Sequence, residues 1–123
     1  MADRILVIDD EDSLRVLYAS ELRREGYEVV VAADADQALA LFSKGQFALA
    51  VVDIELPGMD GLELIGKLKR SRPATPLVIN SAYGTYKADF KSWLADGYVI
   101  KSSDLEPLKA KIKELLTKSD KEE

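Results

Sequence analysis

The sequence contains no cysteine and no histidine. Without cysteine the chain cannot form a disulfide, a thiolate nucleophile or a cysteine-ligated metal site, and without histidine it has neither a Ser-His-Asp triad nor an imidazole ligand. The net charge of -5 opposes the phosphate backbone of nucleic acid. No apolar run approaches the roughly 20 residues that span a bilayer, and the N-terminus lacks the basic and apolar regions of a signal peptide. We therefore expect a soluble, cytoplasmic protein that binds neither nucleic acid directly nor a membrane, and whose chemistry uses carboxylates, lysine, serine or tyrosine.

The composition is that of a folded domain. Hydrophobic residues make up 47% and charged residues 32% of the chain, a balance that favours a globular fold over disorder. The length of 123 residues suits one ordinary domain. We predict a single domain over residues 1–118 and a solvated, charged tail over residues 119–123.

Candidate strands and helices alternate along the chain. Short β-branched runs, typical of strands, occupy residues 5–8, 28–31, 48–52, 77–79 and 98–100. Apolar residues at helical spacing occur in residues 13–26, 34–45, 61–71, 85–97 and 104–118, and we expect the fourth of these helices to be short or irregular. The apolar stripe of the first helix consists of Leu14, Leu17, Tyr18 and Leu22. We expect Asp12 to cap its start and Gly26 its end.

This alternation predicts an α/β fold. Right-handed crossovers between successive strands give a five-stranded parallel sheet with helices on both faces, which is a doubly wound architecture. The strand runs lack polar alternation, as strands buried on both faces should. The second strand ends in Ala32 and Ala33, without a reactive group. That favours an edge position for this strand and the order 2-1-3-4-5, with the reversal of winding between strands one and three.

Polar side chains stand where the other four strands end. Ligands of open parallel sheets bind beyond the carboxyl ends of the strands. The residues at these ends are Asp9, Asp10 and Glu11 on the first strand, Asp53 on the third, Asn80 and Ser81 on the fourth, and Lys101 on the fifth. Converging carboxylates repel one another unless a cation joins them, and Mg²⁺ prefers hard oxygen ligands and often binds phosphate oxygens as well. With Lys101 and Ser81 opposite the carboxylates, the pattern predicts a phosphoryl-transfer site in which an aspartate is the nucleophile.

Each of these residues by itself has an ordinary structural explanation. An acidic cluster before a helix is typical of capping, and an aspartate at the end of a strand often opens a turn. Most single lysines and serines are simply solvated. The functional hypothesis depends on all of them lying at the same edge of one sheet, beside one crevice.

The same residues resemble those of a known family. The segments VIDDED, VVDIELPGMDG, INSAYG and YVIK are similar to the acidic cluster, phosphoacceptor motif, Ser/Thr-Ala step and aromatic-lysine motif of the receiver domains of bacterial two-component response regulators. The resemblance extends over about residues 4–116. It implies the chemotaxis-regulator type of flavodoxin-like fold, with five helices.

The resemblance implies a role for each matching carboxylate. Asp53 would be the phosphoacceptor. Asp10 and Asp53 would bind Mg²⁺, or Mn²⁺ in its place, and Asp9 would assist directly or through water. The backbone carbonyl of Glu55 would complete the protein ligands.

The resemblance also implies a switch and its partners. Ser81 and Lys101 would bind the phosphoryl group, and Ser81 and Tyr98 would act as switch residues that change the face formed by the fourth helix, fifth strand and fifth helix. The donor would be a phosphohistidine on a sensor histidine kinase or a histidine phosphotransfer protein. A downstream protein would bind the changed face of a monomer or weak dimer.

A signalling switch of this kind would catalyse its own phosphorylation and dephosphorylation, without an external substrate. Two other functions are possible for the same residues. A haloacid-dehalogenase-like phosphatase also uses an aspartate nucleophile with Mg²⁺. That family places its nucleophile on the first strand in a DxD motif, whereas Asp53 follows the third. A phosphate-independent, receiver-like interaction module is marked by a lost carboxylate or lysine of the site, and none is lost here.

The sequence departs from the family after its lysine. Ser102 follows Lys101 where the family nearly always has proline. A cis bond costs about 2.5–4 kcal/mol before serine but about 0.5–1 kcal/mol before proline. We therefore predict a trans Lys101-Ser102 bond, with Ser102 or Ser103 helping to cap the last helix. The stretch between Ser81 and Lys101 is also shorter than usual, and Leu56 stands where the family often has methionine.

Overall fold

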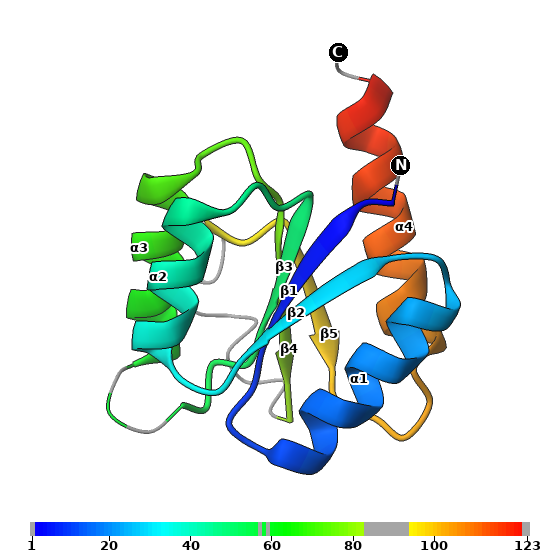
Figure 1. Ribbon diagram of the computed structural model, residues 1–123, viewed down its shortest axis with the longest axis horizontal. Coiled ribbons are helices and arrows are strands. Elements are labelled where there is room, and N and C mark those ends of the chain that lie inside the picture. The colour runs from blue at the N-terminus through cyan, green and yellow to red at the C-terminus, as the bar shows by residue number, and fades with distance from the viewer. Residues whose placement is uncertain (1, 57, 59, 83–93, 122–123) are drawn as a thin grey trace.

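Five strands and four helices make up the described part of the chain. The computed structural model describes residues 2–56, 58, 60–82 and 94–121. The elements, shown in Figure 1, are β1 (Arg4–Ile8), α1 (Asp12–Arg24), β2 (Glu28–Ala32), α2 (Ala35–Lys44), β3 (Leu49–Val52), α3 (Gly61–Ser71), β4 (Leu77–Ser81), β5 (Gly97–Ile100) and α4 (Glu106–Lys121). Within these residues, no helix combines the length and apolar character needed to cross a membrane.

All strands are parallel, in the order β2-β1-β3-β4-β5. This confirms the predicted sheet and its edge strand β2. The chain first winds from β1 outward to β2, then returns past β1 to β3 and continues in the opposite direction. The reversal therefore lies between β1 and β3, where a crevice opens at the carboxyl ends of the strands.

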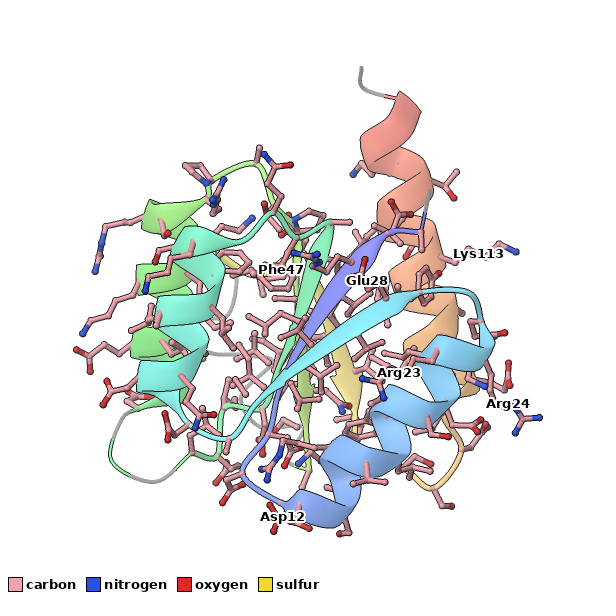
Figure 2. All side chains as sticks on the ribbon, viewed as in Figure 1. Asp12, Arg23, Arg24, Glu28, Phe47 and Lys113 are labelled. Carbon is pink, nitrogen blue, oxygen red and sulfur yellow. The ribbon has the colours of Figure 1, made fainter. Side chains whose placement is uncertain are left out.

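Helices cover both faces of the sheet. Figure 1 shows α2 and α3 on one face and α1 and α4 on the other, and Figure 2 shows side chains filling both layers. Alternate residues of each strand enter opposite layers because the side-chain period of a strand is two. In β1, Leu6 and Ile8 pack in the α2–α3 layer, whereas Ile5 and Val7 pack in the α1–α4 layer. The doubly wound architecture is thereby confirmed.

The number of helices differs from the prediction. The sequence indicated five, and the described residues contain four. The expected fourth helix covers residues 85–97, of which 85–93 lie outside the described residues, and Gly97 already begins β5. The last predicted helix is therefore α4. It continues to Lys121, three residues into the segment expected to be a tail.

Helix α1 differs in detail from its predicted form. Its N-cap is Glu11, without a side-chain capping bond, and Asp12 is already helical and pairs with Arg15. The prediction of Asp12 as the cap was therefore wrong. Gly26 ends the helix as predicted, with a φ of 96° that favours glycine. Leu17 is 42% exposed, because it lies at the edge of the stripe that packs on the sheet.

The loop after β3 is held tightly against the start of α3. The Asp60 carboxylate caps α3 by accepting a hydrogen bond from the Leu62 N–H at 3.0 Å. A Cβ on Gly61 would lie 2.1 Å from the Ile54 Cα, so glycine is needed for this close approach. The backbone that follows Asp53 is thereby packed against a helix rather than left as a loose loop.

Candidate functional site

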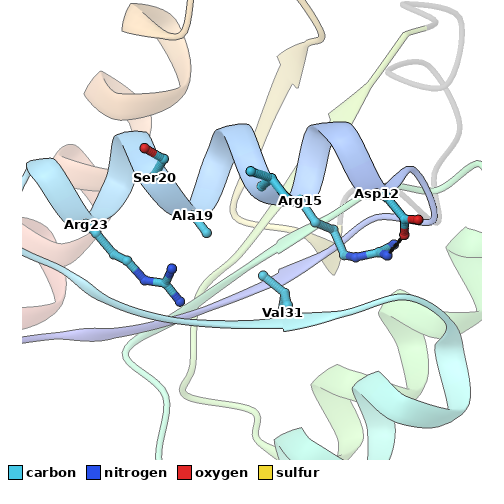
Figure 3. A pocket seen from close by; sticks show the side chains of 7 residues that line it. Asp12, Arg15, Ala19, Ser20, Arg23 and Val31 are labelled. Atoms are coloured by element: carbon cyan, nitrogen blue, oxygen red, sulfur yellow. Dashed lines mark hydrogen bonds and ion pairs between the residues drawn. The ribbon is translucent and has the colours of Figure 1, made fainter.

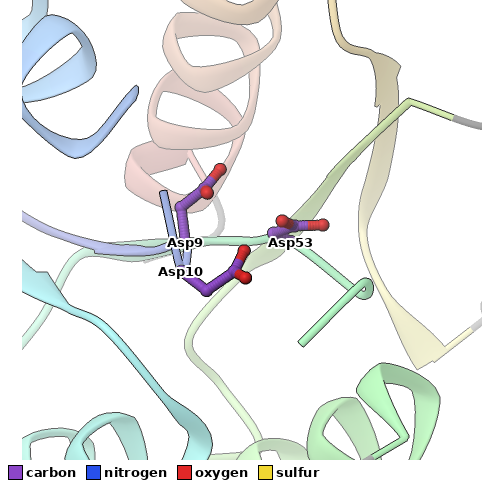
Figure 4. Close-up of side chains that lie close together, drawn as sticks. All are labelled: Asp9, Asp10 and Asp53. Carbon is purple, nitrogen blue, oxygen red and sulfur yellow. The ribbon is translucent and has the colours of Figure 1, made fainter. Parts of the chain in front are cut away.

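Three aspartates meet at the crevice between β1 and β3. Asp9 and Asp10 follow β1, and Asp53 follows β3. The Asp53 N–H donates to the Ile8 carbonyl at 2.9 Å, which keeps the two strand ends side by side. One carboxylate oxygen of each aspartate lies within 4.8 Å of the others, and Figure 4 shows the three side chains converging. The three aspartates that were predicted from their positions at the carboxyl ends of strands are therefore close together in the structure.

Two of these carboxylates are buried and oriented by the backbone. Asp9 is 1% and Asp53 is 2% exposed, whereas Asp10 is exposed. The Glu55 N–H donates to Asp53 Oδ1 at 2.9 Å, and the Glu11 N–H donates to Asp9 Oδ1 at 3.0 Å. In each buried aspartate, Oδ1 thus accepts a hydrogen bond from the backbone N–H two residues further on, and Oδ2 faces the site.

Lys101 links the two buried carboxylates. Its Nζ lies 2.9 Å from Asp9 Oδ2 and 3.0 Å from Asp53 Oδ2, and it donates a hydrogen bond to Asp53. The Lys101 N–H donates to the Ser81 carbonyl at 2.7 Å, which extends the β4–β5 pairing to the lysine. Asp9 Oδ2 is close enough for an ion pair, but it has no partner with hydrogen-bond geometry. One buried carboxylate oxygen therefore remains unsatisfied.

The close approach of these charged groups shifts the pKa values of Asp53 and Lys101. Burial raises the pKa of the Asp53 carboxyl, and the negative charge of Asp9 adds to the effect, although bonds from Glu55 and Lys101 oppose it. Burial acts to lower the pKa of Lys101, but its interactions with the negative charges of Asp9 and Asp53 outweigh burial and raise that pKa. Lys101 is therefore held as the ammonium, while the carboxylates retain an excess of negative charge.

The donor set fits a hard divalent cation. Mg²⁺ binds through carboxylate, carbonyl and water oxygens, and the site offers the exposed carboxylate of Asp10, the unsatisfied Oδ2 of Asp9 and the carboxylate of Asp53. A cation there would satisfy the buried oxygen and relieve the repulsion among the aspartates. The backbone carbonyl of Glu55 stays a predicted ligand, as do the individual roles of the three aspartates.

Ser81 and Tyr98 lie close together at the neighbouring strand ends. Ser81 is fully buried at the end of β4, and Tyr98 is half-buried on β5, where it packs against the α2–α3 layer. Burial raises the pKa of the Tyr98 hydroxyl, and interaction with the nearby Ser81 side chain opposes this effect. The two predicted switch residues are thus in contact, and their switching role stays a prediction.

The connection after Lys101 matches one prediction and corrects another. The Lys101-Ser102 bond is trans, as predicted. The cap of α4 is formed by Asp104, whose Oδ1 accepts the Glu106 N–H at 3.0 Å. Ser102 does not cap the helix itself, since its hydroxyl accepts the Asp104 N–H at 3.1 Å. The serine orients the capping aspartate instead, because the loop places Ser102 too early to reach the first turn.

Three polar residues beside the site had no role in the prediction from sequence. Arg15 Nη1 donates to the backbone carbonyl of Asp9 at 2.7 Å. Tyr18 and Asn80 are both buried, and their side chains lie close enough to interact. Asn80 was noted as a strand-end residue without a role, and Tyr18 was taken as part of an apolar stripe. A hydroxyl at a core position of α1 was the signal available in the sequence.

A separate hollow lies between α1 and β2. It has a volume of about 370 Å³ and is lined by Asp12, Arg15, Val16, Ala19, Ser20, Arg23 and Val31. Figure 3 shows Arg15 and Arg23 reaching from α1 on either side of Val31. None of the three site aspartates lines it. The hollow is thus distinct from the crevice in which the carboxylates meet.

Comparison with known sequences gives a consistent set of relatives. A family model described as the response regulator receiver domain matches residues 5–113. The chain is 36% identical over 118 residues to the two-component response regulator PhoP of Pseudomonas aeruginosa, covering 94% of this chain and 52% of PhoP. It is 36% identical over 114 residues to the transcriptional regulatory protein TcrA of Mycobacterium tuberculosis, covering 91% of this chain and 45% of TcrA. The chain thus spans about half the length of these relatives.

Solved structures of similar fold cover 92–100% of the chain. A CheY-like response regulator receiver domain protein from Methanospirillum hungatei has a TM-score of 0.91 and 36% identity, and all of both chains is covered. The response regulator TrrA of Thermotoga maritima, solved in complex with Mg(2+)-BeF, has a TM-score of 0.89 and 42% identity over 92% of this chain and 98% of TrrA. TrrA in complex with the histidine kinase ThkA gives a TM-score of 0.87, with 42% identity over 93% of this chain and 98% of TrrA.

Proposed function

Because this chain belongs to the family of response regulator receiver domains, we propose that Asp53 accepts a phosphoryl group from a phosphohistidine of a sensor histidine kinase or a histidine phosphotransfer protein. The observation that carries the proposal is the pairing of Lys101 with the buried Asp53 and Asp9 beside the exposed Asp10. An aspartate nucleophile, a cation-binding set of carboxylates and a fixed ammonium are the parts that such a transfer requires.

In the proposed reaction, a carboxylate oxygen of Asp53 attacks the phosphorus atom, and the bond from phosphorus to the histidine nitrogen breaks. The histidine leaves with the electron pair of that bond and takes up a proton, and Asp53 becomes an aspartyl phosphate. Burial of Asp53 keeps water away from the nucleophile. The Lys101 ammonium, 3.0 Å from Asp53 Oδ2, would meet the oxygens of an incoming phosphoryl group.

Mg²⁺, or Mn²⁺ in its place, would be held by Asp9, Asp10, Asp53 and the backbone carbonyl of Glu55. When bound, it supplies Lewis-acid stabilisation of the charge on the transferring phosphoryl oxygens. The TrrA receiver domain was solved with Mg(2+)-BeF, which supports this choice of cation. Hydrolysis of the aspartyl phosphate at the same site would reset the protein, so that no external substrate is turned over.

Phosphorylation would be transmitted through Ser81 and Tyr98. Ser81 would bind the phosphoryl group together with Lys101, and Tyr98, whose side chain lies beside Ser81, would move with it. The surface that changes would be formed by the predicted helix within residues 85–97, β5 and α4, and a downstream protein would bind there. This surface already exposes Ile100 of β5. The cytoplasmic location and a monomeric or weakly dimeric state stay predictions.

The proposal is tested by intact-mass measurement after incubation with acetyl phosphate and Mg²⁺. We expect the addition of one phosphoryl group to the wild type, prevention by EDTA, and loss of the addition in Asp53→Asn. Asp60→Asn is the matched control, because asparagine caps a helix as well as aspartate does and Asp60 serves α3 rather than the site. This variant should be phosphorylated like the wild type.

An unmodified wild type would overturn the assignment and favour the phosphate-independent interaction module. Phosphorylation of Asp53→Asn would mean that another residue is the acceptor. Continuous hydrolysis of a generic phosphate ester by the wild type would instead favour the aspartate-nucleophile phosphatase.

A further inference from the structure

Two buried polar side chains beside the site have no part in the reaction described above. Tyr18 of α1 is 2% exposed and Asn80 of β4 is 3% exposed. Tyr18 belongs to the hydrophobic cluster of the α1–α4 layer, and Asn80 follows Val78 of that cluster by two residues and so faces the same side. Burying a hydroxyl and a carboxamide where apolar side chains would pack is unfavourable unless each finds a partner. The pair therefore calls for an explanation beyond packing.

The register of the sheet places Asn80 next to Asp53. Val52 of β3 pairs with Ile79 of β4, so the residues that follow them, Asp53 and Asn80, end neighbouring strands side by side. Neighbouring strands lie about 4.8 Å apart. Val51 and Val78 both pack in the α1–α4 layer, so Asp53 and Asn80, each two residues further on, face that same side.

Asn80 also lies next to the strand that carries the lysine. Asn80 pairs with Val99 of β5, and Lys101 follows two residues later on the same face. The carboxamide of Asn80 thus stands between the strand of the proposed phosphoacceptor and the strand of the ammonium that pairs with it.

The Tyr18 side chain lies beside this carboxamide. Its hydroxyl is close enough to Asn80, Lys101, Asp9 and Asp53 to interact with each of them. Burial raises the pKa of this hydroxyl, which keeps Tyr18 neutral and able to donate as well as accept. This polar contact connects α1, which starts just after the acidic cluster, with the end of β4.

We propose that Tyr18 and Asn80 are positioning residues of the phosphorylation site: the buried contact between them holds the Asn80 carboxamide beside Asp53 and so keeps Asp53 and Lys101 in register for phosphoryl transfer. The inference rests on the proposed function of Asp53. It predicts that the polar pair is needed for the rate of phosphorylation and not for stability alone.

A pair of apolar replacements separates these two roles. Tyr18→Phe leaves the buried Asn80 carboxamide without its partner, so we expect lower thermal stability and slower phosphorylation. In the double variant Tyr18→Phe/Asn80→Leu both polar groups are gone, and replacing both partners by apolar groups of similar shape is close to neutral for stability. Stability should therefore return toward the wild-type value, and the double variant keeps the test available if the single variant does not fold.

The measurement is the rate of phosphorylation by acetyl phosphate, followed by intact mass at increasing Mg²⁺. We expect the maximal rate of the double variant to fall about tenfold, as is typical when outer-shell partners of a site are removed. The half-saturating Mg²⁺ concentration should stay close to that of the wild type, because neither residue belongs to the proposed metal ligands. Tyr27→Phe is the matched control, since Tyr27 lies in the same layer at the far end of α1, away from the site. It should leave the rate unchanged.

The possible outcomes distinguish the two proposals. A double variant that recovers both stability and the wild-type rate would overturn the positioning role, because the pair would then be structural. A recovered stability with a reduced maximal rate supports it. Failure of the wild type to become phosphorylated would overturn the proposed function, and this inference with it.

Discussion

Replacing Lys101 by methionine should make the stability of the protein strongly dependent on pH. Methionine keeps most of the length of the side chain and removes its charge. The ammonium lies 2.9 Å from Asp9 Oδ2 and 3.0 Å from Asp53 Oδ2. Without it, two buried carboxylates face each other in the cation-free protein, and no other lysine or arginine in the described part of the chain forms an ion pair with either of them.

The size of the effect follows from the geometry. Two unit charges 4.8 Å apart, the upper limit for the site oxygens, repel by about 3.5 kcal/mol at an effective dielectric constant of about 20. The folded protein can escape this repulsion by protonating one carboxylate. With an ordinary aspartate pKa of about 3.9, protonation costs about 5.6 kcal/mol at pH 8 but about 1.5 kcal/mol at pH 5. We therefore expect Lys101→Met to lose about 3–5 kcal/mol of unfolding free energy at pH 8 and at most about 1.5 kcal/mol at pH 5.

The sign agrees with the linkage between protonation and stability. Burial already raises the pKa of Asp53, and removal of Lys101 raises it further. A carboxyl with a higher pKa in the folded state binds more protons there than in the unfolded state, so stability falls as pH rises through this range. Mg²⁺ should oppose the loss, because a cation bound at the carboxylates replaces the missing positive charge and stabilises the folded state.

Urea unfolding at pH 5 and pH 8, in EDTA and in Mg²⁺, measures these differences. Lys67→Met is the matched control, because Lys67 forms a 3.9 Å ion pair with Glu63 on the surface, where its side chain is 38% exposed. Such a pair contributes about 0–0.5 kcal/mol, at either pH. Equal unfolding free energies of Lys101→Met at pH 5 and pH 8 in EDTA would refute the argument that Lys101 compensates buried, ionised aspartates.

Three further predictions concern the metal site, a close contact and a helix cap. Asp10→Ala should weaken Mg²⁺ binding at least about tenfold in calorimetric titration, because no histidine or cysteine can replace the lost ligand. Gly61→Ala should lower the unfolding free energy by about 2 kcal/mol or more, since its Cβ would meet backbone of Ile54 at 2.1 Å. Gly66→Ala, on the same helix, should instead raise it by about 0.5–1 kcal/mol, since its Cβ would meet only the flexible end of Arg70 at 4.0 Å. Asp34→Ala should lower it by about 1 kcal/mol through loss of the α2 cap.

Each of these predictions has a clear contrary result. Unchanged Mg²⁺ affinity in Asp10→Ala would exclude its carboxylate as a ligand. Equal effects of alanine at Gly61 and Gly66 in urea unfolding would show that the contact with Ile54 does not constrain the loop. An unchanged midpoint for Asp34→Ala would mean that solvent replaces the capping bond at no cost.

Much of the fold follows from local features of the sequence. The β-branched runs without polar alternation indicated buried parallel strands, and the run that ends in Ala32 and Ala33 indicated an edge strand. Both inferences were confirmed by the sheet order. The trans bond after Lys101 was predictable for a similar reason, because the preference of a non-proline peptide bond is a local energy of about 2.5–4 kcal/mol that the surroundings seldom overcome.

The sequence also predicted that Asp9, Asp10 and Asp53 lie close together. Once two parallel strands are neighbours, the residues that follow them are brought to the same edge whatever their side-chain conformations. Only the tertiary structure decided which atoms pair there. The contact of Lys101 with two buried carboxylates depends on the path of a flexible side chain, and that path depends on everything that packs around it.

The rotation of each helix about its axis on the sheet could not be predicted from the sequence either. Periodicity identified the apolar side of α1, but the rotation of the helix on the sheet decided that Leu17 is exposed and that Tyr18 is buried against Asn80. The same holds for the caps, because Glu11 rather than Asp12 begins α1, and a shift of one residue depends on how the preceding strand end is anchored. Sequence thus determined which elements form and which polar residues share an edge, since these follow from local energies and strand direction. Tertiary packing decided burial, pairing and capping, since these depend on contacts between segments far apart in the chain.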